Sequence, residues 1–205
     1  EIPAGLQQNA RNTLLESFQK LFQEKQILFK KSSAFSTPNR LIILFESLSK
    51  EITQKAEEVK GPNVNAPEKA IEGFLRSNQI DKNDLFKKKI EKGDFYFFKK
   101  PAKKINTINL LEEYAPLIFD KLQWKKSMKW GSYNLNWARP LKSILAVFNG
   151  KSLNFKFHHL TSSNTTFTDK EFEDRKKIFK DFKSYKNFFK QSGIIIDHNL
   201  RKEFI

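Results

Sequence analysis

Residues 144–157, Ile-Leu-Ala-Val-Phe-Asn-Gly-Lys-Ser-Leu-Asn-Phe-Lys-Phe, carry the strongest local signal in the sequence. An apolar run over 144–148 precedes Asn149-Gly150, and an alternating run over 153–157 follows. Asn-Gly favours a two-residue turn because both residues tolerate positive φ angles. The pattern therefore predicts a β-hairpin whose strands cover 144–148 and 153–157.

Outward from this hairpin, helical and β-like patterns alternate. Apolar residues at every fourth position, from Leu6 to Phe22, predict an amphipathic helix that ends near residue 25. Further helices are predicted over about 67–75, from residue 106 or 107 to about 122, over 179–191, and from residue 197 onward. β-like segments are expected at 32–35 and 40–48 around a turn, at 86–90 and 95–98, and at 194–196, with a loop at 60–63.

This order predicts an α+β fold with a mostly antiparallel sheet and packed helices. We expect residues 1–168 to form one module and residues 169–205 a helical and short-strand segment that leads to another domain. Because the chain starts at Glu1 and stops in a helix-like stretch, we also expect it to be a segment of something longer.

Positive charge dominates the composition, with 38 Lys and Arg against 23 Asp and Glu, a net charge of +15. This is typical of a nucleic-acid partner, although the lysine-rich usage of an AT-rich genome explains the total equally well. The distribution is more specific, because residues 121–168 contain no acidic residue. Eight cations lie in that stretch: Lys121, Lys125, Lys126, Lys129, Arg139, Lys142, Lys151 and Lys156. We expect them to form a positive surface.

Aromatic residues share the acid-free stretch, with Trp124, Trp130, Trp137 and Tyr133 among the lysines. Cations can neutralise phosphates while flat rings stack on exposed bases. The alternative is that the tryptophans are core residues, and for each one singly this is favoured because tryptophan is usually buried.

No complete active site is visible in the sequence. With 7 glycines there is no glycine-rich phosphate loop, and Ser132 and Ser162 lack an evident base. Only His158, His159 and His198 could act as catalytic or ligating imidazoles, and we predict no catalytic residue and no metal site. The absence of cysteine favours a reducing compartment, by default the cytoplasm. No apolar run approaches the roughly 20 residues of a membrane-spanning helix.

Short motifs along the chain resemble the beta subunit of the bacterial two-subunit glycyl-tRNA synthetase. They are Glu1-Ile2-Pro3-Ala4, Thr37-Pro38-Asn39-Arg40-Leu41, Lys60-Gly61-Pro62, Met128-Lys129-Trp130-Gly131, Trp137-Ala138-Arg139-Pro140-Leu141 and His159-Leu160-Thr161. Two positions depart from the family pattern. Asn39 replaces the first of two arginines, and Thr168-Asp169-Lys170 stands where relatives carry Gly-His-Arg.

The resemblance implies the amino-terminal portion of a chain that helps to join glycine to tRNA(Gly). In that family the alpha subunit forms the adenylate from ATP with Mg, and the beta chain is needed for tRNA binding, so no cofactor is expected in this segment. The resemblance also implies a fold like the B3/4 module of phenylalanyl-tRNA synthetase, near the tRNA acceptor arm.

Six residues are the candidates for contact with nucleic acid: Arg40, Lys125, Lys126, Lys129, Trp130 and Arg139. Arg40 could hold a phosphate or equally pair with an acid to pin its turn, and for Trp130 the core interpretation is favoured. Two rival interpretations remain, a stand-alone RNA-binding module and a scaffold for the rest of the assembly. An editing site is disfavoured, because glycine has no smaller amino acid to reject.

Overall fold

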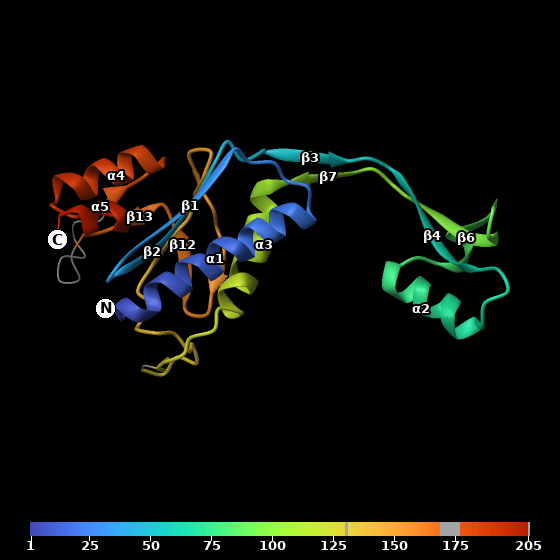
Figure 1. Cartoon of the computed structure of the whole chain (residues 1–205), viewed down its shortest axis with the longest axis horizontal. Coiled ribbons are helices and arrows are strands. Elements are labelled where there is room, and N and C mark those ends of the chain that lie inside the picture. Colours follow the sequence, from blue (N-terminus) through green and yellow to red (C-terminus); the bar gives the residue numbers. More distant parts are fainter. Residues whose placement is uncertain (130, 169–176, 205) are drawn as a thin grey trace. The chain divides into compact units, whose positions relative to one another are not determined.

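A computed structural model describes residues 1–129, 131–168 and 177–204. The chain forms two compact units (Figure 1). Unit 1 comprises residues 1–52 and 106–205, and unit 2 comprises residues 53–105. The domain boundary expected after Thr168 adjoins residues outside the described ranges, and it stays a prediction. Among the described residues, no helix combines the length and apolar character needed to cross a bilayer.

Unit 1 begins with the predicted helix and the predicted hairpin. Helix α1 (Ala4–Glu24) buries the expected stripe, including Ala10, Leu14 and Phe18. Strands β1 (Lys31–Thr37) and β2 (Arg40–Glu46) pair antiparallel around a two-residue turn. Helix α1 packs on this hairpin, where the ring centroids of Phe22 and Phe45 lie 4.8 Å apart.

Helix α3 (Thr107–Asp120) is the second long helix of unit 1, and Pro116 lies inside it. Asn106 caps it, with a side chain that accepts a hydrogen bond from the Ile108 amide at 2.9 Å. The Phe119 ring contacts Phe18 of α1 at 6.3 Å and Phe157 at 5.5 Å. One aromatic core therefore joins α1, α3 and the strands that follow.

The predicted Asn-Gly hairpin is confirmed at its turn and is shorter than expected. Strands β9 (Val147–Phe148) and β10 (Lys151–Ser152) flank Asn149 and Gly150, whose φ angles are 50° and 77°. The Leu153 amide adds one more bond across the hairpin, to the Ala146 carbonyl at 3.0 Å. Beyond it the chain leaves the hairpin, because the buried Ser162 hydroxyl donates to the Leu153 carbonyl at 2.6 Å and accepts from the Phe155 amide at 2.9 Å.

The remaining strands of this region form a second small sheet. Strand β12 (Leu160–Ser163) lies between β11 (Lys156–Phe157), to which it is antiparallel, and β8 (Ile144–Leu145), to which it is parallel. In the described residues the strand pairs β1–β2, β9–β10, β13–β14, β4–β6 and β5–β6 are antiparallel. Helices and small, mostly antiparallel sheets therefore occur together, which confirms the predicted α+β fold.

Unit 1 ends in β13 (Thr165–Thr166), β14 (Lys177–Ile178), α4 (Phe182–Gln191) and α5 (His198–Glu203). Phe179, Tyr185, Phe189 and Ile196 form a core cluster there. The predicted strand at 194–196 is wrong. The Ile195 and Ile196 carbonyls accept hydrogen bonds from Arg201, at 2.6 and 3.0 Å, in place of a strand partner.

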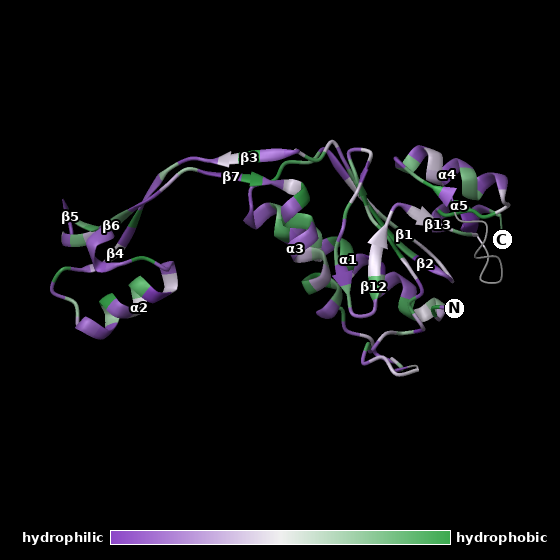
Figure 2. Ribbon diagram, turned by 180° about the vertical axis from the view of Figure 1, so that it is seen from behind, coloured by the Kyte–Doolittle hydropathy of each residue, from purple (hydrophilic) through white to green (hydrophobic). Residues whose placement is uncertain are grey.

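Unit 2 is a three-stranded sheet with one helix. The chain passes between the units through the paired strands β3 (Glu51–Gln54) and β7 (Lys103–Asn106). The sheet has the order β4 (Glu57–Asn63), β6 (Gly93–Lys100), β5 (Leu85–Ile90), and a short 3-10 turn (Lys82–Asp84) precedes β5. Helix α2 (Glu68–Asn78) packs on it (Figures 1 and 2).

The loop predicted at 60–63 is wrong, because these residues belong to β4. Gly61 is needed there for space: a Cβ atom at this position would lie 2.8 Å from the Phe74 ring of α2 and 3.1 Å from the Tyr96 carbonyl oxygen. The strand register shifts between Lys60 and Asn63, which accommodates Pro62.

Candidate nucleic-acid interface

The segment that follows α3, residues 121–143, is an irregular loop held by buried anchors. Its buried side chains are those of Leu122, Leu135, Trp137 and Ala138. Met128 and Trp137 exchange two backbone hydrogen bonds, of 2.8 and 3.3 Å, which hold these two parts of the segment together. We call residues 121–143 the basic loop.

The tryptophans of the basic loop connect it to the core. The Trp137 ring lies 5.0 Å from that of Trp124 and 5.8 Å from that of Phe157. The core interpretation is therefore confirmed for Trp137, and Trp130 lies outside the described residues. Because the rings point inward, the polar side chains between them are left at the surface.

Lys125, Lys126 and Lys129 are exposed on the basic loop. Within the described ranges, none of the three forms an ion pair with a carboxylate. Their charge is thus available for a polyanion, which would gain from neutralisation and from released counterions.

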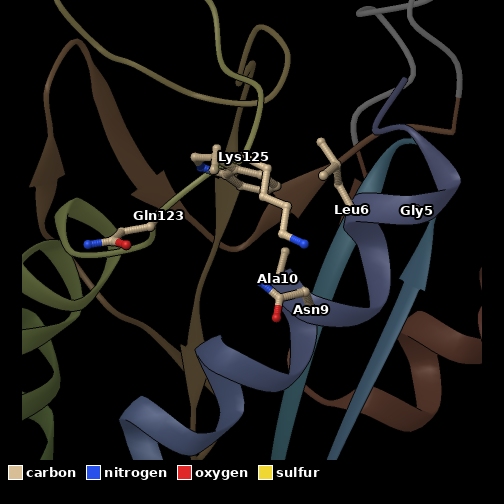
Figure 3. Close-up of a pocket in the computed structure, with 7 residues that line it drawn as sticks. Gly5, Leu6, Asn9, Ala10, Gln123 and Lys125 are labelled. Atoms are coloured by element: carbon tan, nitrogen blue, oxygen red, sulfur yellow. The ribbon is translucent and has the colours of Figure 1, made fainter.

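A small cavity of about 70 Å³ lies where the basic loop meets the start of α1. It is lined by Gly5, Leu6, Asn9, Ala10, Gln123, Trp124 and Lys125. Figure 3 shows the Lys125 side chain reaching toward Ala10 and Asn9. The Lys125 ammonium and the Asn9 side-chain amide at this opening are suitable donors for the oxygen atoms of a phosphate or ribose.

Aromatic surface accompanies these cations. Tyr133 is 44% exposed, and its ring stacks on His159 with centroids 3.7 Å apart and an interplanar angle of 11°. His158 and His159 form the two-residue turn between β11 and β12. His158 lies 3.4 Å from the Asp120 carboxylate. The described residues contain no group of three or more potential metal ligands.

Arg139 is half-buried, and its Nη1 donates to the carbonyl of the preceding residue, Ala138, at 2.7 Å. Since this bond is local, it does not involve a distant part of the chain. The structure therefore places Arg139 on the same loop as the three lysines, with one guanidinium nitrogen already used.

Arg40 is engaged inside unit 1. Its Nη2 donates to the Phe167 carbonyl and, at 3.4 Å, to the Thr168 carbonyl, while its Cζ lies 4.4 Å above the Phe189 ring. Burial lowers the pKa of the Arg40 guanidinium, and a hydrogen bond with Tyr185 acts in the opposite direction. Burial also raises the pKa of Tyr185 to about 12, despite the nearby Arg40. Arg40 thus joins the β1–β2 hairpin to α4.

The acid-free stretch is not one continuous surface. Because β8 and β12 run parallel and β11 runs antiparallel to β12, the 149–150 turn and the 158–159 turn lie at opposite ends of these strands (Figure 1). Lys151 therefore lies away from the end where Asp120 of α3 meets His158 and the basic loop begins. The sequence could not show this, since it depends on which strands pair.

Comparison with known proteins places the chain in a family. The family model described as "Glycyl-tRNA synthetase beta subunit" matches residues 1–205. The glycine–tRNA ligase beta subunits of Rickettsia prowazekii (strain Madrid E) and Rickettsia peacockii (strain Rustic) are each 37% identical over 205 residues, and that of Rickettsia conorii (strain ATCC VR-613 / Malish 7) is 36% identical. Each alignment covers 100% of this chain and 31% of the relative. The chain belongs to the glycyl-tRNA synthetase beta subunit family.

Proposed function

We propose that this chain is a tRNA-binding part of a glycine–tRNA ligase beta subunit, and that the basic loop faces the acceptor arm of tRNA(Gly). The observation that carries the proposal is the basic loop itself. Its rings are anchored in the core, while Lys125, Lys126 and Lys129 are exposed and have no carboxylate partner among the described residues.

In this proposal an alpha subunit, together with ATP and Mg, forms the adenylate, and the beta chain positions the tRNA in the cytoplasm. Family membership supports this division. The basic loop supplies cations and hydrogen-bond donors, which bind and orient a phosphate backbone and perform no bond-making step. Arg139 would add a further cation to the same loop.

The test is a charge reversal, with Lys125, Lys126 and Lys129 each changed to Glu. We expect weaker tRNA binding and a smaller dependence of log K on log salt concentration. Each lost phosphate contact should reduce that slope by roughly 0.7–0.9, so three contacts should reduce it by about 2–3. Filter binding of tRNA(Gly) at several salt concentrations measures both quantities.

The matched control changes Lys183, Lys186 and Lys190 to Glu. These lysines are exposed on α4, and the control alters the net charge of the protein by the same amount. If the control weakens binding as much as the loop variant does, the effect is one of total charge, and the basic loop is not the tRNA face.

A further inference from the structure

The sheet of unit 2 has two faces of different character. Its register places Phe98 of β6 opposite Val59 of β4 and Leu85 of β5, on one face. Helix α2 covers this face, with Phe74 5.9 Å from the Phe98 ring and close to Gly61. Because side chains alternate along a strand, the neighbouring residues project from the other face.

The other face combines three phenylalanines with three lysines. Phe86 pairs with Phe97, Lys88 with Phe95, and Lys60 with Phe97 across the strands. Lys99, opposite Glu58, completes the set. We call Phe86, Phe95, Phe97, Lys60, Lys88 and Lys99 the open face, since α2 lies on the opposite side of the sheet.

Rings and ammonium groups lie side by side on the open face. The Lys60 ammonium is 3.7 Å from the Phe95 ring centroid, and that of Lys88 is 5.5 Å from Phe97. The Phe86 ring stacks on Phe97, at 6.1 Å and 29°, and its residue is 37% exposed. Among the described residues Glu58 is the one carboxylate on this face, and it pairs with Lys88 at 2.5 Å.

We propose that the open face binds an unpaired RNA strand, with a base stacked on the exposed Phe86 ring and phosphates paired with the lysines. Bases stack on aromatic side chains with little dependence on sequence, and lysines beside the rings can neutralise the linking phosphates. Three lysines against one glutamate leave the face positive. The inference rests on the proposed function, since it supplies a second contact for the same class of ligand.

A protein partner is less suited to this face. The centre of a protein interface is usually depleted of lysine, because its ammonium group would lose water without compensation. Here lysines stand between the rings, and Phe97, the central ring, is already buried at 8% exposure. The phenylalanine rings and lysines of the open face therefore suit a ligand whose repeating unit contains a flat ring and an anion.

Two variants of the full protein test the proposal, with a fluorescein-labelled ten-nucleotide oligocytidine as the probe in fluorescence anisotropy. Phe86→Leu removes an aromatic ring but keeps apolar bulk. The double variant Lys60→Gln, Lys88→Gln removes two charges. We expect Phe86→Leu to weaken binding about tenfold, and the double variant to weaken binding and reduce its salt dependence.

The matched control is Lys87→Gln with Lys89→Gln. These lysines lie on β5 as Lys88 does, but the register turns them to the face that α2 covers. The control should leave affinity within about twofold of the parent, because bound phosphates are on the other side. Circular dichroism would confirm that each variant is folded.

The outcomes separate this inference from the proposed function. Unchanged oligocytidine binding in both open-face variants would overturn the inference, even if the basic-loop variant loses tRNA binding. Loss of a copurifying alpha chain in Phe86→Leu, with oligocytidine binding intact, would overturn it in favour of a protein interface. Equal losses in the open-face and control variants would also contradict it, because the effect would then not depend on the face.

Discussion

Arg40 provides the sharpest test of how the structure divides its cations between folding and binding. The sequence offers it as a phosphate ligand, whereas its guanidinium contacts the Phe167 and Thr168 carbonyls and the Phe189 ring. Arg40→Met keeps much of the side chain's length and removes every donor. We expect this substitution to destabilise unit 1 and to leave direct contact with tRNA unaffected.

The magnitude follows from the contacts that are lost. A hydrogen bond to a charged group contributes about 1.5–3 kcal/mol, and the cation–π contact adds roughly 0.5–2 kcal/mol. Burial of the guanidinium has a cost, seen in its lowered pKa, and methionine does not incur it. We therefore expect a net loss of about 2 kcal/mol in the free energy of unfolding.

Urea denaturation followed by tryptophan fluorescence measures this loss, because Trp124 and Trp137 belong to unit 1 and unit 2 contains no tryptophan in its sequence, residues 53–105. For a slope near 2 kcal/mol per molar urea, the midpoint should fall by about 1 M. The urea midpoint of Arg40→Lys should lie between those of the parent and Arg40→Met, because lysine keeps the charge but lacks the planar guanidinium with its several donors. Unchanged stability in Arg40→Met, together with weakened tRNA binding under folding conditions, would refute the reasoning.

Three further predictions concern other contacts in the two units. Because burial raises the pKa of Tyr185 to about 12 from its ordinary value of 10.0, its stabilising contribution is complete below pH 10 and is lost as pH rises toward 12. The unfolding free energy of unit 1 should therefore fall by roughly 2–3 kcal/mol across this pH range. Urea titrations at each pH should show that this fall is absent in Tyr185→Phe. The same dependence of the unfolding free energy on pH in the variant and the parent would contradict the prediction. Gly61→Ala should destabilise unit 2 by about 1–3 kcal/mol through the clash with Phe74, whereas Gly73→Ala, in open space on α2, should stabilise it by about 0.5–1 kcal/mol. Amide hydrogen exchange over residues 53–105 should therefore be faster in Gly61→Ala and slower in Gly73→Ala than in the parent. A change in the same direction in both variants would contradict the packing of Gly61 against Phe74. Asn106→Ala should cost unit 1 about 1 kcal/mol through loss of the α3 cap, while Asn106→Asp should retain most of that stability in thermal denaturation; equal losses in the two variants would argue against capping.

Local patterns predicted the elements that depend on local chemistry. The apolar stripe of α1, the turn between β1 and β2, and the positive φ angles at Asn149 and Gly150 all follow from neighbours along the chain. The local patterns did not predict features that depend on contacts between residues distant in the sequence. The hairpin ends after the bond from the Leu153 amide to Ala146, because the Leu153 carbonyl and the Phe155 amide both bond to the Ser162 hydroxyl.

The candidate interface likewise has a part that the sequence predicted and a part that depends on contacts between distant residues. An acid-free run of sequence identified the basic loop, and the buried Trp137, packed against Trp124, explains why the lysines of the loop are exposed. The sequence did not reveal that Arg40 is held by Phe167 and Phe189, which are more than 120 positions away along the chain. Nor did the run Lys87-Lys88-Lys89 show that strand alternation sends Lys88 to one face and its neighbours to the other.

Crosslinking of tRNA(Gly) to the protein, with the modified lysines identified by mass spectrometry, tests the tRNA-binding proposal most directly. The basic loop should dominate, with Lys125, Lys126 and Lys129 crosslinked to the acceptor arm and protected from acylation when tRNA is bound. Crosslinks that concentrate on the α4 lysines, or equal acylation of the basic loop with and without tRNA, would contradict the proposal.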